Sequence, residues 1–272
     1  MPLRLNPPIR AALATATRPL FGIWVCSGSP VVAEICAGSG LDWILIDMEH
    51  GPNSLPSVLA QLQAVSAYPV AAVVRVPSTD AVVIKQVLDL GAQTLIVPMI
   101  SSAAEAQAAV AAAHYPPRGG RGIGSALARS ARWNRVEGYP TDAHEHVSLI
   151  VQIETAAGVA ASAEIAAVDG VDGVLVGPSD LAASLGRPGE QAHPEVVAAA
   201  LSVVATARAA GVAVGVNAFD PTVADVYLEA GASFMLVGAD VTLLAQGSDA
   251  LAARYLDTPD AAGAAGPAIL ET

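Results

Sequence analysis

The most chemically suggestive stretch of this sequence is residues 43–52, which read WILIDMEHGP. An apolar, strand-like run ends there in Asp47, Glu49 and His50, and then breaks at a Gly-Pro pair. Apolar strands that stop at titratable side chains are how α/β barrels present chemistry at their carboxyl ends. An acidic neighbourhood would orient the ring of His50 and make it a usable base, although a histidine at such a place can also be a packing residue.

Three further apolar runs end in polar residues. Arg75 ends VAAVVR, Gln152 and Glu154 end VSLIVQIE, and DGVLV runs into Gly177-Pro178-Ser179-Asp180. In a barrel these ends converge on one face. A buried guanidinium needs an anionic partner, so Arg75 pairs either with Asp47 or Glu49, or with an oxyanion or carboxylate of a ligand.

Glu154 and Asp180 are the candidate metal ligands. Two carboxylates from neighbouring strands, with the other positions left to water and substrate, suit Mg²⁺ or Mn²⁺ rather than zinc. The alternative for Asp180 is a helix N-cap, since it precedes Leu181.

The single lysine, Lys85, bears on the mechanism. Schiff-base chemistry needs a desolvated lysine at the site, and Lys85 lies within a predicted outer helix. Any carbanion chemistry would therefore use a metal as its electron sink.

The candidate site residues lie within a chain of eight alternating strand and helix units. We predict strands at 21–27, 43–49, 70–76, 94–100, 147–154, 173–176, 212–216 and 233–237. The predicted helices are 30–37, 55–67, a helix capped by 77–80 and ending at 90, 103–113, 157–167, 194–210, 221–230 and one from about 240. Short strands that are apolar on both faces indicate a buried parallel sheet. We expect a single α/β domain over 1–272, a (β/α)8 TIM barrel, because no GxGxxG follows the first strand as an open dinucleotide-binding sheet would require.

Composition limits the possible partners and location. A net charge of −12 argues against nucleic acid. No run approaches the ~18 apolar residues of a membrane span, and residues 1–20 lack a signal-peptide core, with prolines that we expect to interrupt any helix. The two cysteines, Cys26 and Cys36, are expected to be small buried hydrophobes in a cytoplasmic protein.

A long insertion, residues 114–146, interrupts the regular spacing. It contains Arg118, Arg121, Arg129, Arg132 and Arg135, and could bind anions, contact another subunit or be a solvated loop. Residues 257–272 have the composition of a tail.

Taken together, DMEHGP, the strand ending in Arg75, VLDLGAQTLIVPM, YPPRGGRGIGSALARSARWN, QIET and GPSDLAASLG resemble the HpcH/HpaI aldolase family of class II, metal-dependent pyruvate aldolases. The resemblance covers about residues 21–246. It implies a barrel of the phosphoenolpyruvate/pyruvate type and reversible cleavage of 4-hydroxy-2-oxo acids to pyruvate, or a related 2-oxo acid, and an aldehyde, in aromatic catabolism.

The resemblance also implies roles for individual residues. Glu154 and Asp180 would hold a divalent metal (Mg²⁺, Mn²⁺ or Co²⁺), with no organic cofactor; Arg75 would stabilise charge on the keto oxygen, and His50 would accept a proton. Gln152, Gly177, Pro178 and Ser179 would contact the substrate, where relatives often carry alanine in place of Ser179. Trp24 could line the pocket, with core packing as the alternative.

Asp89 is taken in the family to raise the basicity of the histidine. It ends a predicted helix on the barrel face opposite the site, so we expect it to serve His50 of a neighbouring subunit. Family members are hexamers that exchange the last helix, which implies exchange of about 240–272 here.

Two other functions stay open at this point. One is an acyl-CoA lyase of the malyl- or citramalyl-CoA type, which needs a basic groove that only residues 118–135 could provide. The other is a non-catalytic barrel that binds a 2-oxo acid, against which the presence of every expected residue type argues.

Overall fold

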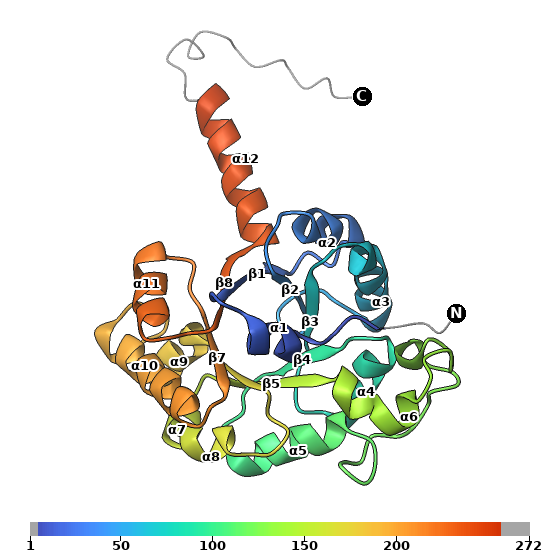
Figure 1. The fold of residues 1–272 in the computed structure, drawn as a ribbon. Helices are drawn as coiled ribbons and strands as arrows, with labels where there is room; N and C mark the ends of the chain where they lie inside the picture. The colour runs from blue at the N-terminus through green and yellow to red at the C-terminus, as the bar shows by residue number, and fades with distance from the viewer. Residues whose placement is uncertain (1–4, 257–272) are drawn as a thin grey trace, which may run out of the picture.

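The computed structural model describes residues 5–256. Eight parallel strands pair in sequence order and close into one barrel, because β1 is hydrogen-bonded to both β2 and β8 (Figure 1). The strands are β1 Leu20–Val25, β2 Trp43–Asp47, β3 Ala71–Arg75, β4 Thr94–Val97, β5 Ser148–Ile153, β6 Gly173–Val176, β7 Ala213–Asn217 and β8 Phe234–Ala239. The predicted (β/α)8 TIM barrel is therefore confirmed.

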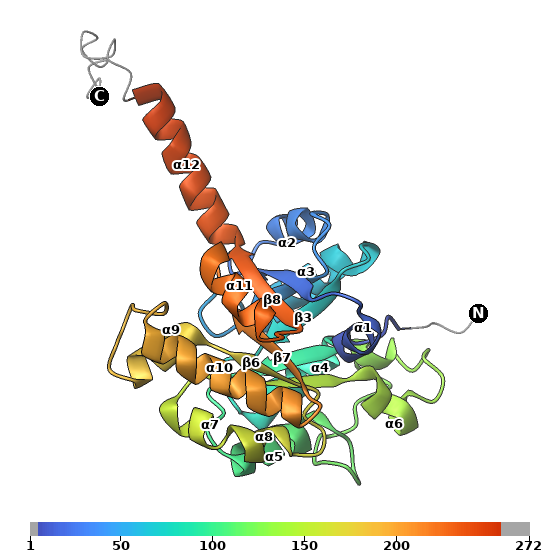
Figure 2. The same cartoon turned by 60° about the vertical axis from the view of Figure 1, so that its left-hand side comes forward.

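Helices surround the barrel (Figures 1 and 2). They are α1 Ile9–Thr15, α2 Pro30–Ala37, α3 Leu55–Ala64, α4 Ala81–Asp89, α5 Ala103–Ala113, α6 Tyr139–Asp142, α7 Ala156–Ala160, α8 Ser162–Ala166, α9 Pro178–Ser184, α10 Pro194–Ala209, α11 Pro221–Glu229 and α12 Asp240–Leu256, with 3₁₀ turns η1 Val65–Ala67, η2 Arg129–Ala131 and η3 Ala143–His146.

Several predicted elements differ from the structure. The helix predicted at 157–167 is divided into α7 and α8 at Ala161, whose backbone leaves the helical region, and α9 was not predicted. The fourth strand ends at Val97, before Pro98, which has no N–H for the ladder. The second strand ends at Asp47, so Met48–His50 form a bend beyond it.

The prediction that prolines prevent an N-terminal helix is wrong. Pro7 and Pro8 precede α1, and Pro8 occupies its N-cap, where a missing N–H costs nothing. The Ile9 amide donates to Thr94 Oγ1 over 3.2 Å, and the Ile9 side chain is buried among the residues inside the barrel. Helix α1 therefore covers the amino-terminal end of the barrel.

The barrel interior is filled by alternate residues of each strand. Trp43 and Phe234 meet edge to face, with ring centroids 5.9 Å apart. Gly22 and Gly215 lie against these two rings, where any Cβ would collide with an aromatic carbon. The interior cluster also contains Leu20, Trp24, Leu45, Val73, Ile96, Ile150, Leu175 and Leu236. Because every second residue of a strand points inward, the next inward position lies at the carboxyl end of the strand. Several of these positions are polar.

Helix α12 projects away from the barrel (Figures 1 and 2). Its side chains Val241, Leu243, Leu244, Leu251 and Leu256 are 43–73% exposed. The predicted tail, residues 257–272, lies outside the described residues. Among the described residues, no helix combines the length and apolarity needed to cross a membrane.

Candidate active site

A cavity of about 390 Å³ lies at the carboxyl ends of the strands. Its walls contain Trp24, Cys26, Asp47, His50, Arg75, Gln152, Leu175, Val176, Gly177, Ser179, Asp180, Asn217, Phe219 and Ala239. Eight of the predicted site residues, from the ends of five strands, therefore line this one cavity. Pro178 begins α9 beside it.

Asp47 and Arg75 form the buried ionic centre of this cavity. They are partners in the β2–β3 register, and Arg75 Nε and Nη2 donate to the two Asp47 oxygens over 2.8 Å each. Arg75 Nη1 lies 2.8 Å from Glu49 Oε2. Burial alone would lower the pKa of Arg75, but the hydrogen bond and charge of Asp47 and the charge of Glu49 outweigh it and raise the pKa. The structural reading of Arg75, a salt bridge to Asp47 and Glu49, is therefore correct.

The ligand-binding interpretation of Arg75 also stays open, because a guanidinium has five N–H donors and the two hydrogen bonds to Asp47 use two of them. Trp24 fixes its plane: the guanidinium carbon lies 4.3 Å from the centroid of the indole ring. Trp24 Nε1 in turn donates to Asn217 Oδ1 over 2.9 Å. Trp24 therefore lines the cavity and packs in the barrel at once.

His50 lies at the open edge of the cavity. Its side chain is 64% exposed, and Nε2 is 3.9 Å from Glu49 Oε2. The bend that carries it is fixed by hydrogen bonds from the Met48 amide to the Arg75 carbonyl (2.9 Å) and from Asn53 Nδ2 to the Asp47 carbonyl (2.6 Å). His50 can thus exchange protons with a ligand or with solvent.

Glu154 is 1% exposed and follows β5 directly. Its Oε1 accepts the Met99 amide over 2.8 Å, and its Oε2 accepts Gln152 Nε2. Met99 adopts φ 60°, a left-handed conformation that aims this amide at the carboxylate. Burial, followed by the charges of Glu49 and Asp180, raises the pKa of Glu154 to about 7 against the weaker opposing effect of the hydrogen bonds.

Asp180 lies in the first turn of α9 and is exposed. The N-cap position belongs to Gly177, and no side chain caps this helix, so the N-cap reading of Asp180 is wrong. Ser179 also lies in this turn, and its Oγ accepts Gln191 Nε2 over 2.8 Å.

The donor set fits a hard divalent cation. Among the described residues no group of three or more His, Cys, Asp or Glu side chains could hold a metal, so Glu154 and Asp180 would need oxygens of substrate and water as further ligands. Gln152 Oε1 is buried without a hydrogen-bond partner and could accept from such a water. A Cβ at Gly177 would come within 2.5 Å of Glu154 Oε2, so only glycine lets the backbone approach this carboxylate.

Sequence reasoning missed four residues here: Asn217, Phe219, Cys26 and Asp240. Asn217 ends β7 as a polar residue after an apolar run, which is the signal that identified the others. Asp240 accepts the amides of Cys26 and Ser27 over 2.9 and 3.0 Å and so joins the ends of β1 and β8. Cys36 is buried as predicted, whereas Cys26 is half-buried at the cavity, where burial and the charges of Asp47 and Asp240 raise its pKa to about 12.

Asp89 is not a cavity residue of its own chain. It ends α4 and forms an ion pair of 2.7 Å with Arg121, whose side chain is 1% exposed. Arg121 also lies 4.7 Å from the ring centroid of Tyr115. Its role toward His50 of another subunit stays a prediction.

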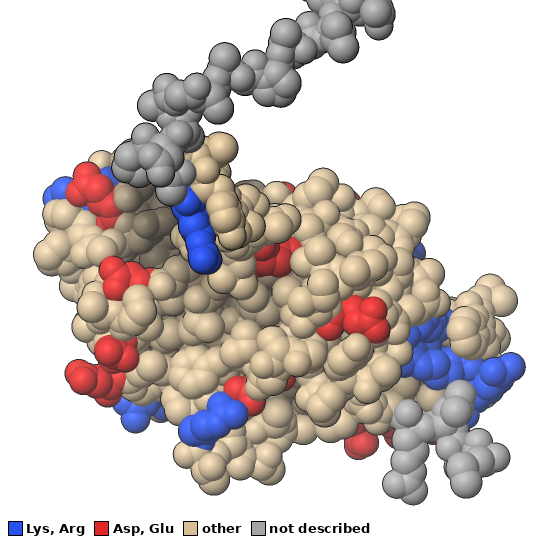
Figure 3. Space-filling view, turned by 90° about the horizontal axis from the view of Figure 1, so that it is seen from above, with Lys and Arg blue, Asp and Glu red and all other residues tan. Residues whose placement is uncertain are grey.

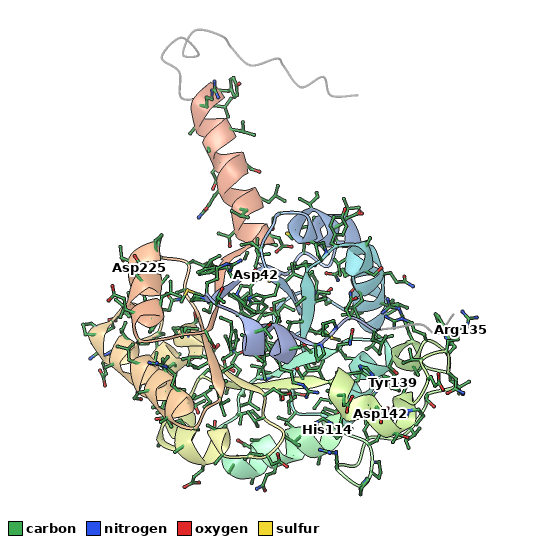
Figure 4. All side chains as sticks on the ribbon, viewed as in Figure 1. Asp42, His114, Arg135, Tyr139, Asp142 and Asp225 are labelled. Atoms are coloured by element: carbon green, nitrogen blue, oxygen red, sulfur yellow. The ribbon has the colours of Figure 1, made fainter. Side chains whose placement is uncertain are left out.

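The insertion is not a free basic groove. Besides Arg121, two of its arginines are bound to backbone carbonyls: Arg129 Nη1 to Leu90 (2.9 Å) and Arg132 Nη1 to Arg129 (2.6 Å). Arg135 lies at the outer edge of the molecule (Figure 4). On the face in Figure 3, charged side chains are scattered over a mainly uncharged surface, with basic ones gathered at one edge.

Comparison with known proteins agrees with this geometry. Residues 20–247 match the model of a family described as "HpcH/HpaI aldolase/citrate lyase". A 4-hydroxy-2-oxo-heptane-1,7-dioate aldolase from Salmonella dublin is 49% identical over 92% of this chain and 95% of its own. A crystal structure of an HpcH/HpaI aldolase/citrate lyase family protein from Burkholderia cenocepacia J2315 has a TM-score of 0.87 and 40% identity, covering 92% of this chain and 99% of that one. An HpcH/HpaI aldolase from Desulfitobacterium hafniense DCB-2 has a TM-score of 0.85 and 27% identity, covering 93% and 98%.

Proposed function

Because this chain belongs to the HpcH/HpaI aldolase/citrate lyase family and is an aldolase of the carbon–carbon lyase class, we propose that it is divalent-metal-dependent and cleaves 4-hydroxy-2-oxo acids reversibly to pyruvate, or a related 2-oxo acid, and an aldehyde. The observation that carries the proposal is the layout of the cavity. A buried arginine, paired with two carboxylates, lines the same cavity as an exposed histidine and Asp180, and the buried carboxylate of Glu154 lies against Gly177 and Gln152 of the cavity wall.

Glu154 and Asp180 are the proposed metal ligands, with Gln152 beside them. A divalent metal, when bound, would supply positive charge to the carboxylate and keto oxygens of the 2-oxo acid. The negative charge of Glu49, Glu154 and Asp180 exceeds what Arg75 neutralises, which favours a cation here. Mg²⁺, Mn²⁺ and Co²⁺ are the candidate metals, because carboxylate oxygens and water suit all three.

Arg75 binds the keto oxygen in this proposal. Two of its N–H groups donate to Asp47 and Glu49 adds an ion pair, so further N–H groups can donate to an oxygen that gains charge as the carbon–carbon bond breaks. Because Trp24 and Asp47 hold the guanidinium before substrate arrives, little reorganisation is needed.

His50 moves the proton. In the cleavage direction it accepts the proton of the 4-hydroxyl, through a water, while the C3–C4 bond breaks to give the aldehyde. The electron pair of that bond stays with C3 of the 2-oxo acid, which then takes a proton to give the methyl group of pyruvate. Glu49 Oε2 lies 3.9 Å from His50 Nε2, where its negative charge favours the protonated imidazole.

We also propose a cytoplasmic homo-oligomer, a hexamer by resemblance. In it α12 is exchanged, and Asp89 approaches His50 of another subunit. The exposed apolar side chains of α12 support the exchange, as do Val31 and Ile35, which are 62% and 69% exposed on α2. Light scattering of the full chain and of a Leu243→Ser/Leu244→Ser variant tests it; an unchanged assembly would contradict the role of α12.

The acyl-CoA lyase alternative loses its main support, because Arg121, Arg129 and Arg132 are bound within the chain. The binding-only alternative is tested directly by activity.

The assay combines pyruvate with glycolaldehyde or succinic semialdehyde, with Mg²⁺ or Mn²⁺ and with EDTA. We expect a metal-dependent aldol product that EDTA abolishes. Activity that survives chelation contradicts the metal mechanism, and the absence of product with every metal and aldehyde favours the binding-only barrel.

A further inference from the structure

The bend that carries His50 runs from Asp47, at the end of β2, to Asn53, shortly before α3. The imidazole of His50 is mostly exposed, and its Nε2 lies 3.9 Å from Glu49 Oε2, which is beyond hydrogen-bond distance. The position of this ring relative to the cavity therefore depends on the backbone of the bend. The residues that hold that backbone are candidates for a role in proton transfer.

Asn53 holds the bend on both sides of His50. Its Nδ2 donates to the Asp47 carbonyl over 2.6 Å, and its backbone amide donates to the Gly51 carbonyl over 2.7 Å. The bend is closely packed here, because a Cβ on Gly51 would lie 2.6 Å from the Asp47 carbonyl oxygen and 2.9 Å from that of Cys26. A change in the orientation of the Asn53 amide would therefore move the backbone around His50.

Gln61 of α3 determines the orientation of the Asn53 amide. Gln61 is 0% exposed, and its Nε2 donates to Asn53 Oδ1 over 2.6 Å. Ser57 Oγ also donates to this oxygen, over 3.0 Å, but it shares its single proton with the Ser54 carbonyl. Because Oδ1 is bound to donors, Nδ2 is the end of the Asn53 amide that faces the Asp47 carbonyl. A chain of two short hydrogen bonds therefore joins buried Gln61 to the start of the bend.

Stability alone does not explain a glutamine at position 61. Within residues 5–256 the buried Oε1 of Gln61 has no hydrogen-bond partner, and a buried acceptor without a partner costs stability. Methionine at this position would remove that acceptor with little change in volume. Asn53 Oδ1 would keep the Ser57 hydroxyl as a donor, so this oxygen would still have a partner. Loss of the Gln61 amide should therefore affect the orientation of Asn53 more than the stability of the fold.

We propose that Gln61 is a positioning residue for proton transfer by His50. It orients the Asn53 amide, and Asn53 holds the bend so that the His50 imidazole stays within reach of a ligand hydroxyl or its water. Gln61 is not among the described residues that line the active-site cavity, so it acts through Asn53 and not on the ligand. The inference rests on the proposed function, in which His50 accepts the proton.

The experiment compares the full-length protein with Gln61→Met, Asn53→Ala, His50→Ala and the double variant His50→Ala/Gln61→Met. Gln63→Met is the matched control, because it makes the same substitution at an exposed position of the same helix. Each protein is assayed with Mn²⁺, pyruvate and glycolaldehyde for kcat and for the KM of pyruvate. Calorimetric titration measures Mn²⁺ affinity, and urea denaturation measures stability.

We expect Gln61→Met to lower kcat about threefold to tenfold, the range for one hydrogen bond. Asn53→Ala removes the hydrogen bond to Asp47 directly and should lower kcat at least as much. In Gln61→Met the KM of pyruvate and the Mn²⁺ affinity should stay unchanged, and the urea midpoint should be unchanged or higher. Gln63→Met should match the unaltered protein in every measurement.

The double variant distinguishes a positioning role from a structural one. If Gln61 acts through His50, Gln61→Met should have no further effect on kcat once His50 is replaced. The inference is overturned by an unchanged kcat in Gln61→Met, by the same fold-loss of kcat with and without His50, or by a fall in both the urea midpoint and Mn²⁺ affinity. Absence of product from the unaltered protein with every metal and aldehyde overturns the proposed function instead.

Discussion

Asp47 and Arg75 are register partners on β2 and β3, and two hydrogen bonds of 2.8 Å join their side chains inside the barrel. The pair occupies the next inward position after the apolar layer of Leu45 and Val73. The same alternation that fills the barrel with Trp43 and Leu45 therefore delivers a carboxylate to its upper end. The alternation of residues along β2 and β3 therefore determines both the packing of the barrel interior and the position of the Asp47–Arg75 pair.

Removal of Asp47 should be costly for folding. In Asp47→Ala the Arg75 charge stays buried with only Glu49 beside it, and breaking a buried pair typically costs about 3–5 kcal/mol. Urea denaturation measures the change in the free energy of unfolding. Glu195→Ala, which breaks an exposed ion pair with Arg187, should change the free energy of unfolding little, because solvent screens that pair. If both variants lost the same free energy of unfolding, the buried Asp47–Arg75 pair would contribute no more to stability than an exposed one.

Variants of His50 and Glu154 should distinguish proton transfer from metal binding. We expect His50→Ala to lower kcat about 10²- to 10⁴-fold, the usual contribution of a general base, and to bind Mn²⁺ as before. Glu154→Ala should lose Mn²⁺ affinity as well as activity. Calorimetric titration with Mn²⁺ and steady-state kinetics measure both.

His193→Ala is the control for His50, because His193 caps α10 through the Glu195 amide, outside the active-site cavity. Its kinetics should be those of the unaltered protein. Loss of Mn²⁺ binding in His50→Ala would contradict the assignment of His50 as the base.

Gly177 should be intolerant of even one methyl group. In Gly177→Ala the new Cβ would lie 2.5 Å from Glu154 Oε2 and 2.9 Å from Gln152 Nε2. The buried carboxylate must then shift, so we expect Mn²⁺ affinity to fall by at least about tenfold, or 1.4 kcal/mol. In Gly120→Ala, where no atom lies within 4 Å of the Cβ position, affinity should be unchanged. Unchanged affinity in Gly177→Ala would mean that Glu154 is not a ligand.

The fold could be predicted from the sequence because its strands are apolar on both faces and regularly spaced. The strand at 173–176 was predicted with its observed bounds. The predicted bounds of an element were wrong where a single residue determines where the element ends or begins, such as Pro98 after β4 or Pro8 at the N-cap of α1. A proline can precede a helix as readily as interrupt one, and only the packing of Ile9 into the barrel selects between the two.

The site was predictable where a charged residue ends an apolar strand, as at Asp47, Arg75 and Glu154. Asn217 was missed because a strand-end asparagine is also typical of turns. The partner of Asp89 within its own chain, Arg121, comes from the insertion and required the folded arrangement.

The buried carboxyl of Glu154 should make the stability of the metal-free protein fall as pH rises. Its pKa is about 7 in the folded chain, against 4.5 as the ordinary value. The folded state therefore binds this proton more tightly than the unfolded state, and the stabilisation is complete below pH 4.5 and lost between 4.5 and 7. The difference in the free energy of unfolding amounts to about 3 kcal/mol as an order of magnitude.

Urea denaturation in EDTA from pH 4.5 to 7 measures this loss of stability. Comparison with Glu154→Gln isolates the contribution of Glu154, because the variant has no carboxyl group to titrate at this position. Mn²⁺ should remove the loss above pH 7 in the unaltered protein, since the metal takes the place of the proton. Parallel pH profiles of the two proteins in EDTA would show that Glu154 ionises without cost.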